Sequence, residues 1–135
     1  MGVTRLLDTS TLVDILRGHP VVSERFRAAV RKELAVSSIS TGELITGAAR
    51  ARNTHEESFS VDLLLRPLVE LPIDARTARR AGLLSVMLHR AGTPIGTSDR
   101  LIAAAALEHD AIIVTSDVRH FSRVPGLIVE DWRAA

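Results

Sequence analysis

Four acidic residues stand at positions where strands are expected to end or helices to begin. Asp8 and Asp117 each follow a short apolar run that predicts a buried strand, and Glu43 and Asp99 lie at the openings of two predicted helices. In a parallel sheet the carboxyl ends of all strands share one edge, and the following helices begin there. The four carboxylates are therefore expected to meet in one pocket.

Each acid taken alone also has an ordinary structural explanation. Asp8 suits a turn or cap, Glu43 lies three residues after Ser40 as in a capping box, Asp99 suits the positive end of a helix dipole, and Asp117 suits an Asx turn. Together they are unfavourable, because two carboxylates 4 Å apart repel by about 4 kcal/mol at an effective dielectric near 20. A cation would remove that repulsion.

The chemistry of such a pocket follows from its oxygen donors. The chain has no cysteine, and carboxylates without thiolates suit hard ions such as Mg²⁺ or Mn²⁺, which bind substrate phosphates readily. A carboxylate pocket of this kind is suited to phosphodiester hydrolysis. The five histidines show no metal-ligand spacing, and most of them are expected at the surface: His19, His55, His89, His109 and His120.

The elements that must position these acids alternate between strands and helices. Strands are predicted at Val3–Leu7, Leu34–Ile39, Leu68–Ile73, Ala111–Val114 and Leu127–Val129, with helices after Asp8, at about 21–33, from Ser40–Glu43 to Arg50, at about 56–65, from the Asp74 cap to about 89, and from Asp99 to Leu107. This alternation predicts an α/β fold with a parallel sheet covered on both faces. Pro72 indicates that the third strand lies at an edge or ends early.

The stretch Thr97–Asp117 shows how two of the acids are brought together. A helix of about a dozen residues spans about 18 Å, and the strand after it runs back in the opposite direction. Asp99 and Asp117 therefore return to the same edge, although they are 18 positions apart. The apolar run Leu101–Leu107 predicts a helix buried on more than one side.

Composition sets the broad class of the protein. A chain of 135 residues that is 46% hydrophobic predicts one folded domain over residues 1–135. The absence of a membrane-length apolar run, of a signal peptide and of cysteine leads us to expect a cytoplasmic protein without membrane contact. Net charge is +1 and Lys32 is the only lysine; the arginine bias suits phosphate recognition but is equally explained by a G- and C-rich genome.

At these acids the chain resembles the PIN-domain family, and within it the VapC-type toxins of type II toxin–antitoxin pairs. The likeness covers essentially the full length and rests on four motifs in order. These are Leu7–Ser10 with Leu12–Asp14; Ser40–Leu44; Asp99–Ala104 with Ala106-Leu107; and Val114–Asp117 with His120-Phe121 and Pro125–Leu127.

The resemblance implies a fold, a reaction and a set of site residues. The fold is a three-layer α/β/α PIN-like fold with a central, mainly parallel five-stranded sheet. The activity is a metal-dependent endoribonuclease using Mg²⁺, for which Mn²⁺ can substitute. Asp8, Glu43, Asp99 and Asp117 match the family's acidic positions, with Asp8, Asp99 and Asp117 as metal ligands and Glu43 acting on the attacking water. Ser10 and Thr115 match hydroxyls that shape the pocket; Arg100 and Arg119 are either substrate phosphate contacts or ordinary surface arginines.

The resemblance also implies partners. A cognate VapB-type antitoxin is expected to block the site, RNA is the expected substrate, a homodimer is usual in the family, and DNA is reached only through the antitoxin. The helices between Val21 and Leu65 are candidate contact surfaces for either protein partner.

Other classes of function fit these residues less well. A receiver-type signalling domain needs a lysine near its acids, and Lys32 lies at the far end of a helix. A non-catalytic RNA- or protein-binding PIN-like module would tolerate loss of the acids and would not respond to Mn²⁺. A small-substrate metal phosphatase fits the acids but not the four motifs.

Overall fold

The computed structural model describes residues 2–134 and contains a five-stranded, all-parallel sheet. The strands are β1 (Arg5–Leu7), β2 (Leu34–Ser37), β3 (Val69–Leu71), β4 (Ile112–Val114) and β5 (Val129–Glu130), in the order β3-β2-β1-β4-β5. β1 is central and pairs with β2 and β4. β3 lies at one edge and ends before Pro72, as the sequence predicts.

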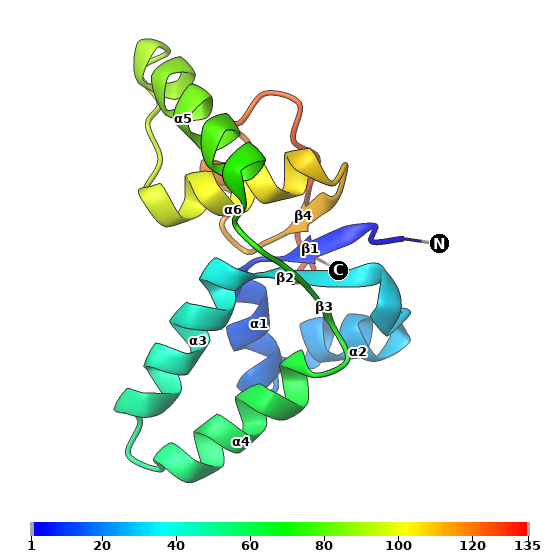
Figure 1. The fold of residues 1–135 in the computed structure, drawn as a ribbon. Helices are drawn as coiled ribbons and strands as arrows, with labels where there is room; N and C mark the ends of the chain where they lie inside the picture. The colour runs from blue at the N-terminus through cyan, green and yellow to red at the C-terminus, as the bar shows by residue number, and fades with distance from the viewer. Residues whose placement is uncertain (1, 135) are drawn as a thin grey trace.

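Helices cover both faces of this sheet and form three layers (Figure 1). The helices are α1 (Thr9–Leu16), α2 (Pro20–Ala28), a 3₁₀ turn (Arg31–Glu33), α3 (Ser38–Arg50), α4 (Thr54–Leu65), α5 (Ala75–Arg90), α6 (Thr97–Glu108) and α7 (Val118–Phe121). α5 and α6 lie on one side of the sheet, and α1 to α4 lie on the other. The predicted α/β fold is confirmed.

Alternation along the strands builds a separate core on each face. Leu6 and Leu7 are both fully buried, but Leu6 packs with α5 and α6 whereas Leu7 packs with α1, α2, α3 and α4. Ile113 and Val114 divide in the same way. Successive side chains of a strand point to opposite faces, so a sheet covered on both sides buries side chains on both faces of its central strands.

The buried helix α6 fits because its side chains are small. Ile102–Ala106 are all buried, between the sheet and α5. The alanines allow α6 to pack closely while Asp99 in its first turn stays at the carboxyl edge. Close packing of this kind fixes the position of the helix start, and with it the position of Asp99.

Several element boundaries differ from the prediction, among them the end of α2 and the start of α3. The helix expected to reach Glu33 ends at Ala28, because Ala29 is extended and Val30 is 51% exposed. α3 begins at Ser38 and not at Ser40, since Ser37 is its N-cap and accepts a hydrogen bond from the backbone N–H of Ser40. Ser40 and Glu43 therefore form no capping box, and Glu43 lies in the second turn.

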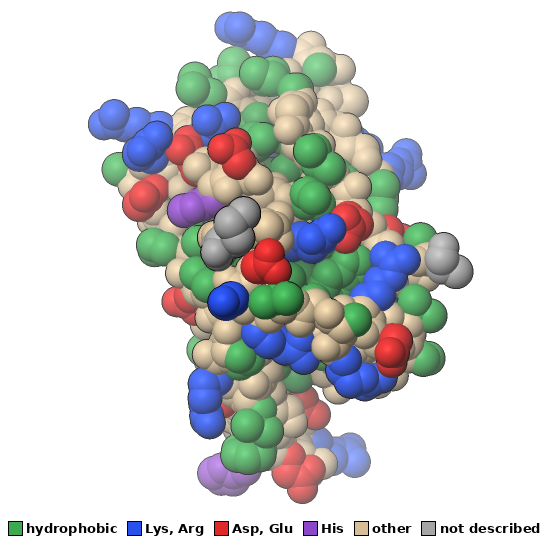
Figure 2. Space-filling view, turned by 90° about the vertical axis from the view of Figure 1, so that its right-hand side faces the viewer, with side chains coloured by type: hydrophobic (Ala, Val, Ile, Leu, Met, Phe, Trp, Pro, Cys, Tyr) green, Lys and Arg blue, Asp and Glu red, His purple; other side chains and the backbone are tan. Residues whose placement is uncertain are grey.

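The surface that carries both chain ends is chemically mixed. Basic, acidic and hydrophobic side chains are interspersed there, without one sign of charge dominating (Figure 2). Within residues 2–134, no helix is both long enough and apolar enough to cross a membrane.

Candidate active site

The predicted acids lie at the carboxyl edge of the sheet. Asp8 follows β1 directly and is the N-cap residue of α1, and Asp117 follows β4 and is the N-cap residue of α7. β1 and β4 are neighbours in register, and the backbone N–H of Asp8 donates to the carbonyl of Val114 over 2.9 Å. Parallel pairing thus makes neighbours of two acids that are far apart in the chain.

Asp8 is a buried carboxylate held by hydroxyl groups. Its side chain is 5% exposed, and its Oδ2 accepts hydrogen bonds from Thr115 Oγ1 at 2.7 Å and Ser10 Oγ at 3.1 Å. Burial raises the pKa of Asp8, the two hydroxyls partly offset that rise, and the charge of Glu43 adds to it. No arginine or lysine faces this carboxylate among residues 2–134.

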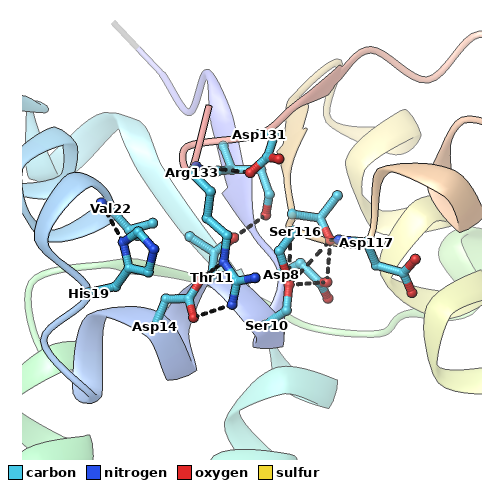
Figure 3. A network of polar contacts seen from close by, with 12 residues as sticks. Asp8, Ser10, Thr11, Asp14, His19, Val22, Ser116, Asp117, Asp131 and Arg133 are labelled. Carbon is cyan, nitrogen blue, oxygen red and sulfur yellow. Dashed lines mark hydrogen bonds and ion pairs between the residues drawn. The ribbon is translucent and has the colours of Figure 1, made fainter. Parts of the chain in front are cut away.

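The hydroxyls that hold Asp8 also join the ends of β1 and β4. Ser10 Oγ accepts from the backbone N–H of Ser116 at 3.1 Å (Figure 3), and Thr115 Oγ1 accepts from the N–H of Asp117 at 2.9 Å. Ser10 and Thr115 are therefore placed where the family resemblance expects pocket-shaping hydroxyls.

Asp99 is a half-buried carboxylate without a hydrogen bond from any residue between 2 and 134. Burial raises the pKa of Asp99, and the charges of Asp8 and Asp117 raise it further, while His120 opposes them. A carboxylate that is surrounded by other carboxylates and accepts no hydrogen bond is the arrangement that a bound cation would stabilise.

His120 joins the acids, although the spacing of the histidines along the sequence does not predict a metal ligand. Its Nδ1 lies 2.6 Å from Oδ2 of Asp117, and its backbone N–H donates to Oδ1 of the same residue at 3.4 Å. Candidate ligand atoms of Asp99, Asp117 and His120 all lie within 4.8 Å of one another. The sequence signal was the three-residue spacing from Asp117 to His120, which becomes a contact once α7 forms.

Glu43 reaches the site from α3 and is the most exposed of the four acids. Its Oε1 lies 2.7 Å from Oγ1 of Thr9, the residue after Asp8. A groove of about 440 Å³ begins at Thr9 and Glu43 and continues along α1, α3 and α4, where Val13, Leu44 and Val61 line it.

The two arginines beside the acids differ in their surroundings. The Arg100 guanidinium donates to the carbonyl of Ile95 at 2.7 Å and to Thr97 Oγ1 at 3.2 Å, so it secures the loop before α6. Arg119 is exposed and makes neither an ion pair nor a hydrogen bond within residues 2–134. Of the two, Arg119 has the guanidinium free for a ligand.

A second buried aspartate, Asp14, lies on α1 on the side away from the site. The Arg133 guanidinium contacts both of its carboxylate oxygens at 2.7 Å (Figure 3). These hydrogen bonds hold the pKa of Asp14 below its usual range. The pair ties the C-terminal segment to α1 and takes no part in the acidic site.

The donors of the site fit a hard divalent cation. Asp8, Asp99 and Asp117 offer carboxylate oxygens, which suit Mg²⁺ and Mn²⁺. The free carboxylate of Asp99 and the mutual repulsion that raises its pKa both point to a cation at this edge. Water and phosphate oxygens would complete its coordination.

Comparison with known proteins places this chain in a family. The PIN domain family matches residues 5–127. The tRNA(fMet)-specific endonuclease VapC of Salmonella typhimurium is 33% identical over 128 residues, which cover 94% of this chain and 96% of the relative. Ribonuclease VapC2 of Rickettsia felis is 30% identical over 129 residues, with the same coverage.

Solved structures are similar over nearly the whole chain. The DNA-bound VapBC complex of Salmonella typhimurium contains a chain with a TM-score of 0.90 and 32% identity, covering 96% of this chain and 98% of that one. The VapBC2 complex of Rickettsia felis, bound to a fragment of its promoter DNA, gives 0.87 and 29% with the same coverage.

Proposed function

This chain belongs to the PIN-domain family, and from that membership we propose that it is the metal-dependent endoribonuclease toxin of a toxin–antitoxin pair. The relatives that match this chain over nearly their whole length are named VapC ribonucleases, and the similar solved structures are VapBC complexes. The observation that carries the proposal is the meeting of four carboxylates at one sheet edge, where Asp99 accepts no hydrogen bond and pairs with no arginine or lysine within residues 2–134.

Asp8 and Asp99 would hold a Mg²⁺ ion, for which Mn²⁺ can substitute, and Asp117 would complete that site or a second one. A bound divalent cation supplies charge neutralisation of the carboxylates and polarises the scissile phosphate. Thr115 and Ser10 keep Asp8 in one orientation through its Oδ2, which leaves Oδ1 for the ion. His120 also restrains the orientation of Asp117, because its backbone N–H and its Nδ1 contact the two oxygens of that carboxylate.

Glu43 would orient the attacking water and accept its proton. The water oxygen would bond to phosphorus, the P–O3′ bond would break and the leaving O3′ would take up a proton from solvent, which leaves a 5′-phosphate and a 3′-hydroxyl. Arg119 is the better placed of the two arginines to contact substrate phosphate, since Arg100 already binds Ile95 and Thr97. The hydrolysis itself does not use the ribose 2′-hydroxyl, so selection of RNA is a matter of binding.

The test is cleavage of RNA in the presence and absence of Mg²⁺ by the wild-type protein and by Asp8→Asn. Asp62→Asn, an exposed acid on α4, serves as the control. We expect Mg²⁺-dependent cleavage by the wild type and by the control, and none by Asp8→Asn with its fold intact. Equal cleavage by all three proteins would refute the assignment. It would also be refuted if the wild-type protein bound RNA without hydrolysing it and did not respond to Mn²⁺, as expected of a non-catalytic binding module.

The proposed partner is a VapB-type antitoxin, and the groove beside Glu43 is the surface that we propose it covers. Gly47 lies in this groove on α3, and an added side chain would meet open space there. We expect Gly47→Arg to fold normally and to bind the antitoxin much more weakly. Ala49→Arg, on the other side of the same helix, should bind as the wild type does; equal binding by both variants would move the antitoxin to another face.

A further inference from the structure

A single hydroxyl connects the two helices that carry Asp8 and Glu43. Thr9 is the first residue of α1 and follows Asp8 directly. Its Oγ1 lies 2.7 Å from Glu43 Oε1 and 2.8 Å from Ser40 Oγ, and both of those residues belong to α3. Thr9 is therefore joined to Asp8 through the backbone and to the carboxylate of Glu43 through its side-chain hydroxyl.

The direction of these two hydrogen bonds follows from the protons available. A hydroxyl has one proton to donate, and an ionised carboxylate only accepts. Thr9 therefore donates to Glu43 or to Ser40 and not to both at once, and a hydrogen bond to a carboxylate is the stronger of the two. Thr9 thus links the Glu43 carboxylate to the fully buried hydroxyl of Ser40.

Glu43 needs such a partner more than the other acids do. It is exposed and has three side-chain torsions, whereas Asp8 is buried and held at two sites. Thr9 is suited to the task, because branching at Cβ restricts its χ1 angle and its position at the start of α1 is fixed by the helix.

We propose that Thr9 is a positioning residue, which holds the Glu43 carboxylate in register with Asp8 for proton transfer from the attacking water. The inference rests on the proposed ribonuclease function and adds a residue that neither the family motifs nor the spacing of the acids identifies as functional. It gives the threonine of the Leu7–Ser10 segment a role that is separate from starting the helix.

The test compares kcat and KM for RNA cleavage by Thr9→Val, Thr9→Ser and the wild type. Valine keeps the shape and removes the hydroxyl, and we expect kcat to fall about 10- to 100-fold with little change in KM, because a misplaced catalytic group costs about that much. Serine restores the hydroxyl and should recover most of the lost kcat. Thr41→Val is the matched control, since Thr41 makes the same kind of bond to Glu70, 2.6 Å long, outside the acidic cluster; its kcat should match the wild type.

Two further measurements separate positioning from stability. Thr9→Val leaves the buried Ser40 hydroxyl without a partner, so Ser40→Ala in the same protein should restore the melting temperature but not kcat. In a Glu43→Gln background, Thr9→Val should reduce kcat by less than about twofold, because a residue that acts through Glu43 has nothing left to position.

Each outcome has one interpretation. A wild-type kcat in Thr9→Val would overturn the positioning role of Thr9 but not the proposed function. The same holds if Thr9→Val causes its full loss of kcat in the Glu43→Gln background, or if Ser40→Ala restores kcat together with the melting temperature. Absence of Mg²⁺-dependent cleavage by the wild type overturns the proposed function, and this inference with it.

Discussion

Asp8 lies at the start of α1, and Asp14 lies six positions later within the same helix. Both residues are buried, with 5% and 7% of their surface exposed. Their electrostatic surroundings are opposite. Arg133 contacts both carboxylate oxygens of Asp14 and lowers its pKa, whereas Asp8 accepts hydrogen bonds from the hydroxyls of Thr115 and Ser10, forms no ion pair within residues 2–134, and has its pKa raised by burial. The chain thus supplies a cation to the acid that secures its C-terminal segment and leaves the other acid free to receive one from solution.

The same contrast holds for a second pair of acids. Glu130 of β5 accepts hydrogen bonds from Arg5 and from the indole of Trp132, and the Arg5 bond lowers its pKa. Asp99 accepts none from residues 2–134, and its pKa is raised by burial and by neighbouring carboxylates. Asp14 and Glu130 are thus paired with arginine, whereas Asp8 and Asp99 lie among other carboxylates. The two pairs of acids should respond oppositely to substitution, pH and metal.

The largest difference is expected in activity. Asp99→Asn should reduce Mg²⁺-dependent RNA cleavage more than about 100-fold, since loss of a ligand exceeds the usual 10- to 100-fold effect of losing a residue that supports one. Asp14→Asn should cleave at nearly the wild-type rate at a temperature where it is folded. Initial rates at saturating Mg²⁺ measure both; equal losses in the two variants would mean that the division of the acids is wrong.

The next difference is in stability, and it has the reverse order. Asp14→Asn removes the charge that Arg133 pairs with, so we expect the melting temperature to fall by a few degrees; the exposure of Arg133 limits the effect. Asp99→Asn removes a repelled charge, so in metal-free solution its melting temperature should equal or exceed that of the wild type. Thermal unfolding at neutral pH with a chelator tests this order, and a less stable Asp99→Asn protein would contradict it.

The sequence predicted the acids well and their partners poorly. Asp8, Asp99 and Asp117 could be placed because strand ends and helix starts follow from local apolar periodicity, and a parallel sheet then brings them to one edge. The Asp14–Arg133 pair spans 119 positions and the Thr9–Glu43 contact spans 34, and no local pattern encodes which polar side chains meet across such separations.

Short elements were the other source of error. The one-turn helix α7 is too short to show a period, and this hid the contact between His120 and Asp117. The helix over Pro20–Ala28 was extended too far because the apolar spacing continues through Ala29 and Val30, while the extended backbone of Ala29 ends the helix without a glycine.

A smaller difference is expected in the dependence of stability on pH. A carboxyl whose pKa is raised on folding binds its proton more tightly in the folded state, so the free energy of unfolding falls as pH rises from the ordinary carboxyl pKa, near 4, through the raised value. Asp8 and Asp99 should act in this way in the metal-free protein. Asp14 has a lowered pKa, so its contribution is present above the ordinary value and is lost as pH falls through the lowered one.

Melting temperatures from about pH 2 to pH 8 separate these contributions. The advantage of Asp99→Asn over the wild type should be present at neutral pH and disappear below about pH 4, where the wild-type carboxyl becomes protonated in the folded and the unfolded state. The deficit of Asp14→Asn should persist to lower pH before it disappears. An advantage of Asp99→Asn that is independent of pH would show that charge is not its cause.

The acids of this edge should repel one another until a cation binds between them, and paired melting curves of the wild type and Asp99→Asn with and without Mn²⁺ test this. At about a hundredfold excess over its dissociation constant, the ion stabilises a binding protein by about 2.7 kcal/mol. We expect Asp99→Asn to melt at or above the wild type with a chelator and below it with Mn²⁺. If Mn²⁺ leaves both melting temperatures and their order unchanged, the acidic edge is not a metal site.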